Sequence, residues 1–390
     1  MGRLLSSRQV RSALSGLALL LAAAALVAYP LEALEGARAG LDLCANVIVP
    51  SLFPFFVLSA LILDLGFAEA LGRALSPLMR PLFRLDGVCA SALVLGLVGG
   101  YPVGARTAME LYKNGRCSPA EAQRMLAFCN NSGPAFIFGA VGAGVFGQSR
   151  IGLLLYGVHL LSSLLVGLLF RFYPENSGGR RMAGSAAAPP KPLAAAFTGA
   201  VTGAMGGALH ISAFVLLFSI VIRLLSCSGV LPALVTALTA LLAPLEVEGI
   251  WIAAWLTGLL ELSGGVWALS ELSNLSVGMT LASFMLGWAG LSVHCQTLSF
   301  LGGSGLSCRS YFLGKLLHGV ISAALLQVFL HRMPLPAVVY LAEQTETLTL
   351  LERSSTLTAA TTASFALFAL FLFFSAYTQR KRGQSHLKKH

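Results

Sequence analysis

Long apolar runs alternate with short polar breaks along this chain. The longest runs are predicted to cross a bilayer as helices, at residues 12–29, 44–67, 151–172, 210–225, 311–330 and 357–377. Of two stretches between them, 69–85 is predicted as a helix at the membrane surface and 230–245 as a surface helix or a short helix. The pattern predicts an all-α, polytopic integral membrane protein.

Shorter apolar runs end in breaks that are rich in glycine and small polar residues. The breaks occupy residues 99–104, 130–134, 261–265 and 290–294. A helix interrupted at membrane depth leaves peptide groups without partners, so such breaks occur where the backbone lines a cavity or is covered by protein. We therefore predict two re-entrant hairpins and two broken helices. Paired interruptions in two halves of a chain indicate the substrate site of a transporter.

The composition supports a membrane protein. Hydrophobic residues make up 56% of the chain and charged residues 11%, whereas soluble domains carry roughly 25% charged residues. The net charge of +10 comes from Lys and Arg near segment ends, which indicates orientation in a membrane and not a nucleic-acid partner. The seven cysteines are odd in number and include no CxxC pair, so we expect reduced packing residues, no metal site and no cofactor.

The distribution of charge predicts the topology. The N-terminal segment, the Gly/Ala/Ser/Pro-rich linker and the C-terminal tail are basic and are expected in the cytoplasm, while the patches around 32–42 and 343–352 are acidic and are expected outside. The two halves would then be inverted repeats. The predicted divisions are an N-terminal helix and connection (1–40), the first repeat (41–173), the linker (174–192), the second repeat (193–331), and an external segment with a last helix and tail (332–390).

In the first half, candidate substrate-binding residues lie at the breaks. Gly100, Tyr101 and Pro102 precede a new helix, whose free amides favour an anionic group. Arg106 follows one turn later and suits a carboxylate; the alternative is an arginine at the membrane interface. The remaining candidates are the adjacent polar side chains of Asn130, Asn131 and Ser132, which need a solute, water or another helix as partner. Ser132 is also expected to cap a helix that begins at Pro134.

In the second half, the candidates for substrate binding are Ser263, Gly264, Ser292 and Gln296. Glu261 could carry a coupling proton or pair with Arg106, or it could be an ordinary residue at a hairpin tip. His294 could relay a proton or be a core histidine. The sequence contains no nucleotide-binding P-loop, serine-hydrolase elbow or zinc-protease motif, so an enzyme is not predicted.

Four segments together resemble the YlbJ family of sporulation integral membrane proteins, a branch of the nucleoside-recognition Gate domain membrane proteins. They are IVPSLFPFF (48–56), GGYPVGA (99–105), NNSGPAFIFGA (130–140) and GLSVHCQ (290–296). The resemblance implies two Gate-type repeats and a fold similar to concentrative nucleoside transporters. It also implies a role in endospore formation, the movement of dipicolinate, a small aromatic dicarboxylate, across the outer forespore membrane.

We therefore expect a secondary transporter of a small organic anion in a bacterial cell membrane, with both termini in the cytoplasm. Two alternatives are a transporter of nucleosides or another neutral solute, and a sporulation scaffold that transports nothing. The sequence leaves open coupling to H⁺ or Na⁺, the direction of transport and the formation of a homo-oligomer.

Overall fold

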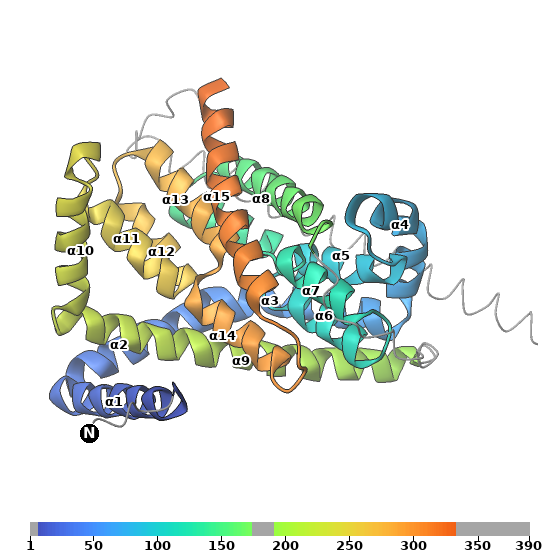
Figure 1. Ribbon diagram of the computed structural model, residues 1–390, viewed down its shortest axis with the longest axis horizontal. Helices are drawn as coiled ribbons and strands as arrows, with labels where there is room; N and C mark the ends of the chain where they lie inside the picture. Colours follow the sequence, from blue (N-terminus) through green and yellow to red (C-terminus); the bar gives the residue numbers. More distant parts are fainter. Residues whose placement is uncertain (1–6, 174–190, 333–390) are drawn as a thin grey trace, which may run out of the picture. The chain divides into compact units, whose positions relative to one another are not determined.

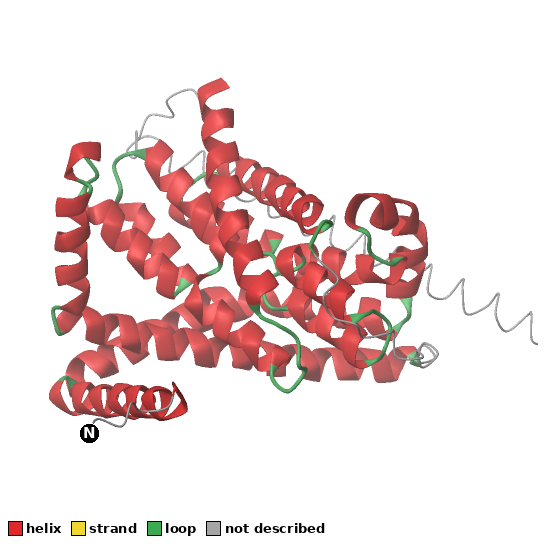
Figure 2. Cartoon of the chain, in the orientation of Figure 1, coloured by secondary structure: helices red, strands yellow, loops and turns green. Residues whose placement is uncertain are grey.

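The computed structural model describes residues 7–173 and 191–332, in which every regular element is a helix and no strand occurs (Figures 1 and 2). The helices of the first half are α1 (Ser7–Ala28), α2 (Pro30–Leu43), the π-helix η1 (Cys44–Ile48), α3 (Val49–Asp64), α4 (Phe67–Phe83), α5 (Ala90–Gly99), α6 (Val103–Lys113), α7 (Pro119–Phe128), the π-helix η3 (Ala135–Val145) and α8 (Ser149–Phe170).

The second half follows the linker. Its helices are α9 (Leu193–Cys227), α10 (Val230–Leu241), α11 (Gly249–Leu260), α12 (Leu262–Ala268), α13 (Leu275–Trp288), α14 (Gly290–Leu301) and α15 (Arg309–Arg332). Short 3₁₀ turns occupy Gly87–Cys89, Ala243–Leu245 and Leu269–Glu271.

Several of these helices are long and apolar enough to cross a bilayer. Four candidate spans are α8, α9, the range Leu275–Leu301 and α15. Two bent pairs also qualify, one formed by α1 with α2 at 97° and one by α4 with α5 at 98°, so the described residues hold up to six spans. The chain is an integral membrane protein, as its apolar runs predict.

The same order of elements occurs in both halves. A long helix (α3 or α9) is followed by a second helix (α4 or α10), a hairpin (α5–α6 or α11–α12), a broken helix (α7–η3 or α13–α14) and a final span (α8 or α15). The predicted hairpins and broken helices are therefore present. The opposite orientation of the two halves in the membrane stays a prediction.

The structure corrects three predicted boundaries. The acidic connection after the first span is the helix α2, which Pro30 begins because proline is preformed for the first helical position. The span predicted from residue 210 begins at Leu193 and is 35 residues long. The break at 261–265 is confined to Glu261, since its side chain caps α12 and lets the following residues form a helix. The last helix (357–377), the tail and most of the linker lie outside the described residues.

Small residues let the central helices approach closely. A Cβ atom added at Gly96 or Gly104 would lie 1.8 or 1.9 Å from the carbonyl oxygen of Cys129, and one at Gly314 would lie 2.3 Å from that of Ala127. The first hairpin and α15 therefore pack directly against the backbone of α7. In a bilayer, where lipid is as apolar as leucine, such close packing takes over from hydrophobic burial as the main source of helix association.

Candidate functional site

Each hairpin tip packs against the break of a broken helix. In the first half, Gly100 has φ +76° and lies so close to Gly133 that an added Cβ would be 2.9 Å from its nitrogen. In the second half, Gly290 has φ +77°, and a Cβ added to it would be 3.0 Å from the nitrogen of Leu262. The non-helical backbone is thus covered by protein, and under that condition it is tolerated at membrane depth.

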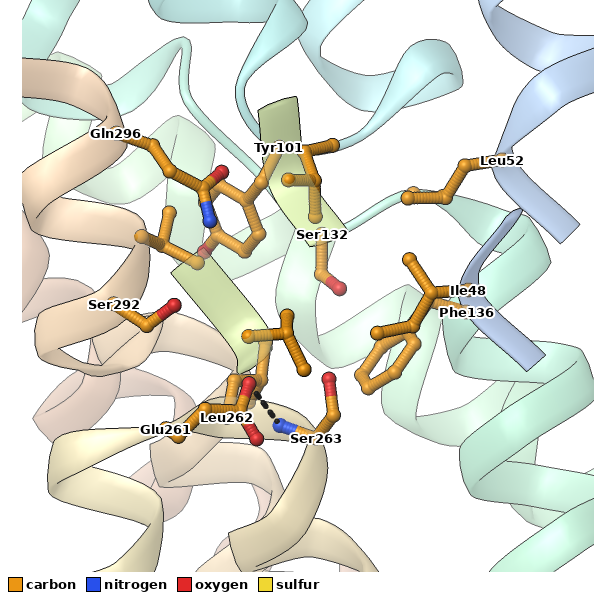
Figure 3. Close-up of a pocket in the computed structure, with 14 residues that line it drawn as sticks. Ile48, Leu52, Tyr101, Ser132, Phe136, Glu261, Leu262, Ser263, Ser292 and Gln296 are labelled. Atoms are coloured by element: carbon orange, nitrogen blue, oxygen red, sulfur yellow. Dashed lines mark hydrogen bonds between the residues drawn. The ribbon is translucent and has the colours of Figure 1, made fainter. Parts of the chain in front are cut away.

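A central cavity of about 50 Å³ lies where these tips and breaks meet (Figure 3). Its apolar lining consists of Ile48, Leu52, Phe136, Ile211, Val215, Leu262 and Val293. Its remaining lining consists of Tyr101, Ser132, Gly133, Glu261, Ser263, Ser292 and Gln296. An apolar wall with a few convergent polar groups is typical of a small-molecule site.

Polar atoms without partners lie in the lining of this cavity. The Oγ atom of Ser292 and both amide atoms of Gln296 are buried and make no hydrogen bond within the protein. An unpaired buried polar atom costs about 1–3 kcal/mol, and water or a solute in the cavity can supply the missing partner. The predicted candidates Ser292 and Gln296 are therefore available to a ligand.

Glu261 is only 2% exposed and stabilises the tip of the second hairpin. Its carboxylate accepts hydrogen bonds from the backbone N–H groups of Ser263 at 3.0 Å and Gly264 at 2.6 Å, and the first of these is drawn in Figure 3. The negative charge is thereby compensated at the N-terminal end of α12. The pairing with Arg106 that the sequence suggested does not occur, because backbone donors hold this carboxylate.

The polar residues of the first break hold the surrounding helices. Asn130 donates from Nδ2 to Thr297 Oγ1 at 3.0 Å, and its Oδ1 accepts from the N–H of Ala105 at 3.4 Å. Asn131 donates to the carbonyl of Phe128 at 2.9 Å. The side chain of Ser132 lines the cavity and does not cap the following helix; its backbone N–H donates to a histidine of α8.

Lys315, which sequence reasoning did not single out, is fully buried behind Tyr101. Its Nζ atom lies 2.7 Å from the Tyr101 hydroxyl and 2.9 Å from the carbonyl of Asn130. The signal was present, because a lysine inside an apolar span is a functional candidate by default. Lys315 joins α15 to both the first hairpin and the first break.

His294 lies in the core beside the cavity and is not among its lining residues. Its Nδ1 atom is 2.9 Å from the Tyr311 hydroxyl, and its ring meets that of Trp288 edge-on at 4.4 Å. Its Nε2 atom has no partner. His294 is thus a buried imidazole with one free nitrogen, and its part in a proton relay stays a prediction.

Two predicted residues lie in a second cavity, of about 460 Å³, formed mainly by α3, α6 and α9. Pro102 and Arg106 line it, as do Asp64, Glu110 and Lys191. Arg106 forms an exposed ion pair with Glu110 at 2.9 Å. The structure therefore separates Arg106 from the residues that line the central cavity.

The described residues include no group of three His, Cys, Asp or Glu that could hold a metal ion. All seven cysteines are free.

Comparisons with known proteins identify the family. Residues 45–149 match the family model Gate, described as nucleoside recognition. A solved structure of CNTnw in its intermediate 3 state aligns over 83% of this chain and 85% of its own, with a TM-score of 0.45 and 14% identity. The sporulation integral membrane protein YlbJ of Bacillus subtilis (strain 168) is 33% identical over 322 residues, which cover 77% of this chain and 78% of the relative. By that identity and coverage, the chain belongs to the YlbJ family of sporulation integral membrane proteins.

Proposed function

We propose that this protein is a secondary transporter of a small organic anion, and that the anion is dipicolinate, moved across the outer forespore membrane during endospore formation. The central cavity is the proposed solute site. Both halves contribute to it, the first through Tyr101 and Ser132 and the second through Ser292 and Gln296.

The observation that carries this proposal is the set of unpaired polar atoms at the cavity. Ser292 Oγ and the amide of Gln296 face a space between four chain breaks and have no partner in the protein. A permanent structural role would require partners, because buried polar groups are nearly always hydrogen-bonded. A transported solute that enters and leaves explains why these groups are left without one.

The charge at the cavity favours an anion. Lys315 lies directly behind Tyr101, and among the described residues no carboxylate forms an ion pair with it. Glu261 is compensated by the backbone donors of α12. A buried cation raises the affinity of a low-dielectric site for negative charge, so a carboxylate in the cavity would be attracted across the Tyr101 ring.

Transport of a neutral solute is the second candidate. It is favoured by the match of residues 45–149 to a nucleoside-recognition model. Hydroxyl groups of a nucleoside would pair with the amide of Gln296 and the carboxylate of Glu261, which lines the same cavity.

Binding to the purified protein distinguishes these candidates. Titration calorimetry would compare dipicolinate, uncharged pyridine-2,6-dicarboxamide and uridine. We expect dipicolinate to bind and the diamide to bind at least about tenfold more weakly, the equivalent of ~1.4 kcal/mol. Ser292→Ala should weaken dipicolinate binding, whereas Ser270→Ala, which removes a hydroxyl bonded only within its own exposed turn, should not. Binding of uridine without dipicolinate would favour the neutral-solute candidate.

A further inference from the structure

Lys315 places its amino group in an unusual position. It is 0% exposed and lies within α15, one of the four candidate spans. Removing an ammonium group from water costs several kcal/mol unless hydrogen bonds and opposite charge compensate it. The surroundings of its Nζ atom therefore indicate whether this group is charged.

Three acceptors surround Nζ. They are the hydroxyl of Tyr101 at 2.7 Å, the carbonyl of Asn130 at 2.9 Å and Nδ1 of His318 at 3.3 Å. The Tyr101 hydroxyl donates its own hydrogen to the carbonyl of Leu286 at 2.7 Å, so it can only accept from the lysine.

The tautomer of His318 follows from its second contact. Its Nε2 atom lies 3.0 Å from the carbonyl oxygen of His159. A carbonyl only accepts, so Nε2 carries the hydrogen, and in the neutral imidazole Nδ1 is then an acceptor. All three contacts of Nζ therefore need a hydrogen from the lysine. An ammonium group supplies three and a neutral amine supplies two, so the bonding pattern fits the charged form.

The Asn130 carbonyl is a site where a cation is expected. It lies just after α7 ends, at Phe128, within the first break. The C-terminal end of a helix carries partial negative charge, and in broken-helix transporters the freed carbonyls at such ends coordinate the coupling ion. Here the ammonium group of Lys315 on α15 donates a hydrogen bond to that carbonyl.

We propose that Lys315 is a tethered cation that takes the place of a bound metal cation at the first break, so that this break binds no Na⁺ and transport needs none there. Only the statement that transport needs no Na⁺ at this break rests on the proposed transport function. The occupied carbonyl is a property of the folded protein and can be tested without transport.

Thermal unfolding of the purified full chain tests the proposal. The Tm of the natural protein should be the same in NaCl and in choline chloride at equal ionic strength. Lys315→Ala should lower the Tm by several degrees, because it leaves the acceptors around Nζ without a donor. The deleted atoms correspond to propylamine, so n-propylammonium should restore part of the lost Tm and uncharged propan-1-ol should not. Lys113→Ala removes an exposed lysine and should respond to neither compound.

Two results would overturn the proposal. One is a Tm of the natural protein that rises when Na⁺ replaces choline. The other is a Lys315→Ala variant that unfolds as the natural protein does, or that propan-1-ol restores as well as n-propylammonium does.

If Lys315→Ala yields no folded protein, Tyr101→Phe provides the test, since it removes one acceptor and keeps the ammonium in place. We then expect a lowered Tm that is still indifferent to Na⁺, and stabilisation of Tyr101→Phe by Na⁺ would contradict the proposal. Because unfolding is measured, loss of dipicolinate uptake leaves this result unaffected.

Discussion

Gln296 illustrates how single side chains of this protein depart from the rules of a packed core. Its amide is 1% exposed, and neither its oxygen nor its nitrogen has a partner. Asn130, at a similar depth, is held by Thr297 and the backbone of Ala105. Amide side chains of the two halves thus have different roles, since Asn130 joins helices and Gln296 faces the central cavity.

Gln296→Met is predicted to separate stability from solute binding. Methionine has nearly the shape of glutamine but carries no amide to satisfy, so the Tm of the empty protein should stay the same or rise. Dipicolinate affinity should fall at least about tenfold, equivalent to ~1.4 kcal/mol. Unfolding and titration calorimetry measure the two quantities.

Gln327→Met is the matched control, because that amide is exposed and bonds to Thr280 on the neighbouring helix. It should leave dipicolinate affinity unchanged. A Gln296→Met variant that loses stability and keeps its affinity would show that this amide is structural.

The sequence could predict which residues reach the cavity only where they adjoin a break. Tyr101, Ser132, Ser292 and Gln296 were found because glycine and polar residues interrupt an apolar run. Lys315 was missed because it lies inside an uninterrupted helix, where neighbours in the sequence do not indicate contacts with the first half. The partner of Arg106 was indicated by the sequence, since Glu110 lies one turn away on the same helix and competes with any distant carboxylate.

At the scale of elements, the hairpins depend on contacts between backbones. The first hairpin and the first broken helix touch through Gly96, Gly104 and the carbonyl of Cys129. The second hairpin closes on itself in a similar way, because a Cβ at Gly265 would lie 2.1 Å from the Cα of Gly258. No side chain fits between these segments, so the position of each tip is fixed by its glycines.

Gly104→Ala is predicted to destabilise the protein. The new Cβ would lie 1.9 Å from the Cys129 carbonyl oxygen, so the hairpin must move away from α7. Overpacking of this kind costs about 1–3 kcal/mol, although alanine in a helix gains up to ~1 kcal/mol over glycine. The expected result is a lower Tm together with weaker dipicolinate binding, because Tyr101 would be displaced.

Gly157→Ala is the matched control, since a Cβ at this helical glycine meets nothing within 4 Å. Its Tm should be unchanged or slightly higher. Equal effects of both substitutions on the Tm would refute the importance of close backbone packing at the first hairpin.

The elements could be predicted better than their ends. Apolar periodicity located both hairpins and both broken helices. The apolar pattern placed the start of α9 too late. The stretch before residue 210 is helical, but it is rich in alanine, glycine and threonine and is therefore only weakly apolar. The pattern placed α2 in a loop because its acidic residues interrupt the apolar pattern, whereas their helix packs along α9.

In the whole described bundle, both cavities lie along the interface between α3 and α9. Residues at intervals of four along this side of η1 and α3 line first the central cavity and then the second one, namely Ile48, Leu52, Phe56, Ala60 and Asp64. Leu52 and Phe56 belong to the apolar cluster between them. The second cavity holds exposed charges and therefore suits an access path to the central site.

Arg106→Ala is predicted to slow uptake and leave the binding site intact. The arginine lines the second cavity and is 56% exposed, so its charge acts by attracting anions before they reach the site. The apparent KM for dipicolinate should rise, and the difference from the natural protein should shrink at high salt. Affinity measured by calorimetry should not change.

Glu110→Gln frees Arg106 from its ion pair and provides the opposite change, so it should lower the KM at low salt. Loss of calorimetric binding in Arg106→Ala would instead show that the arginine contacts the bound solute.

Transport of dipicolinate is tested most directly by uptake of the labelled compound into liposomes that contain the purified protein. We expect saturable uptake that unlabelled dipicolinate inhibits, that uridine does not inhibit, and that persists when choline replaces Na⁺. This uptake should be strongly reduced in Ser292→Ala combined with Gln296→Met. Folded protein that takes up no dipicolinate under either a proton or a Na⁺ gradient would contradict it, and uptake of uridine in its place would establish the neutral-solute alternative.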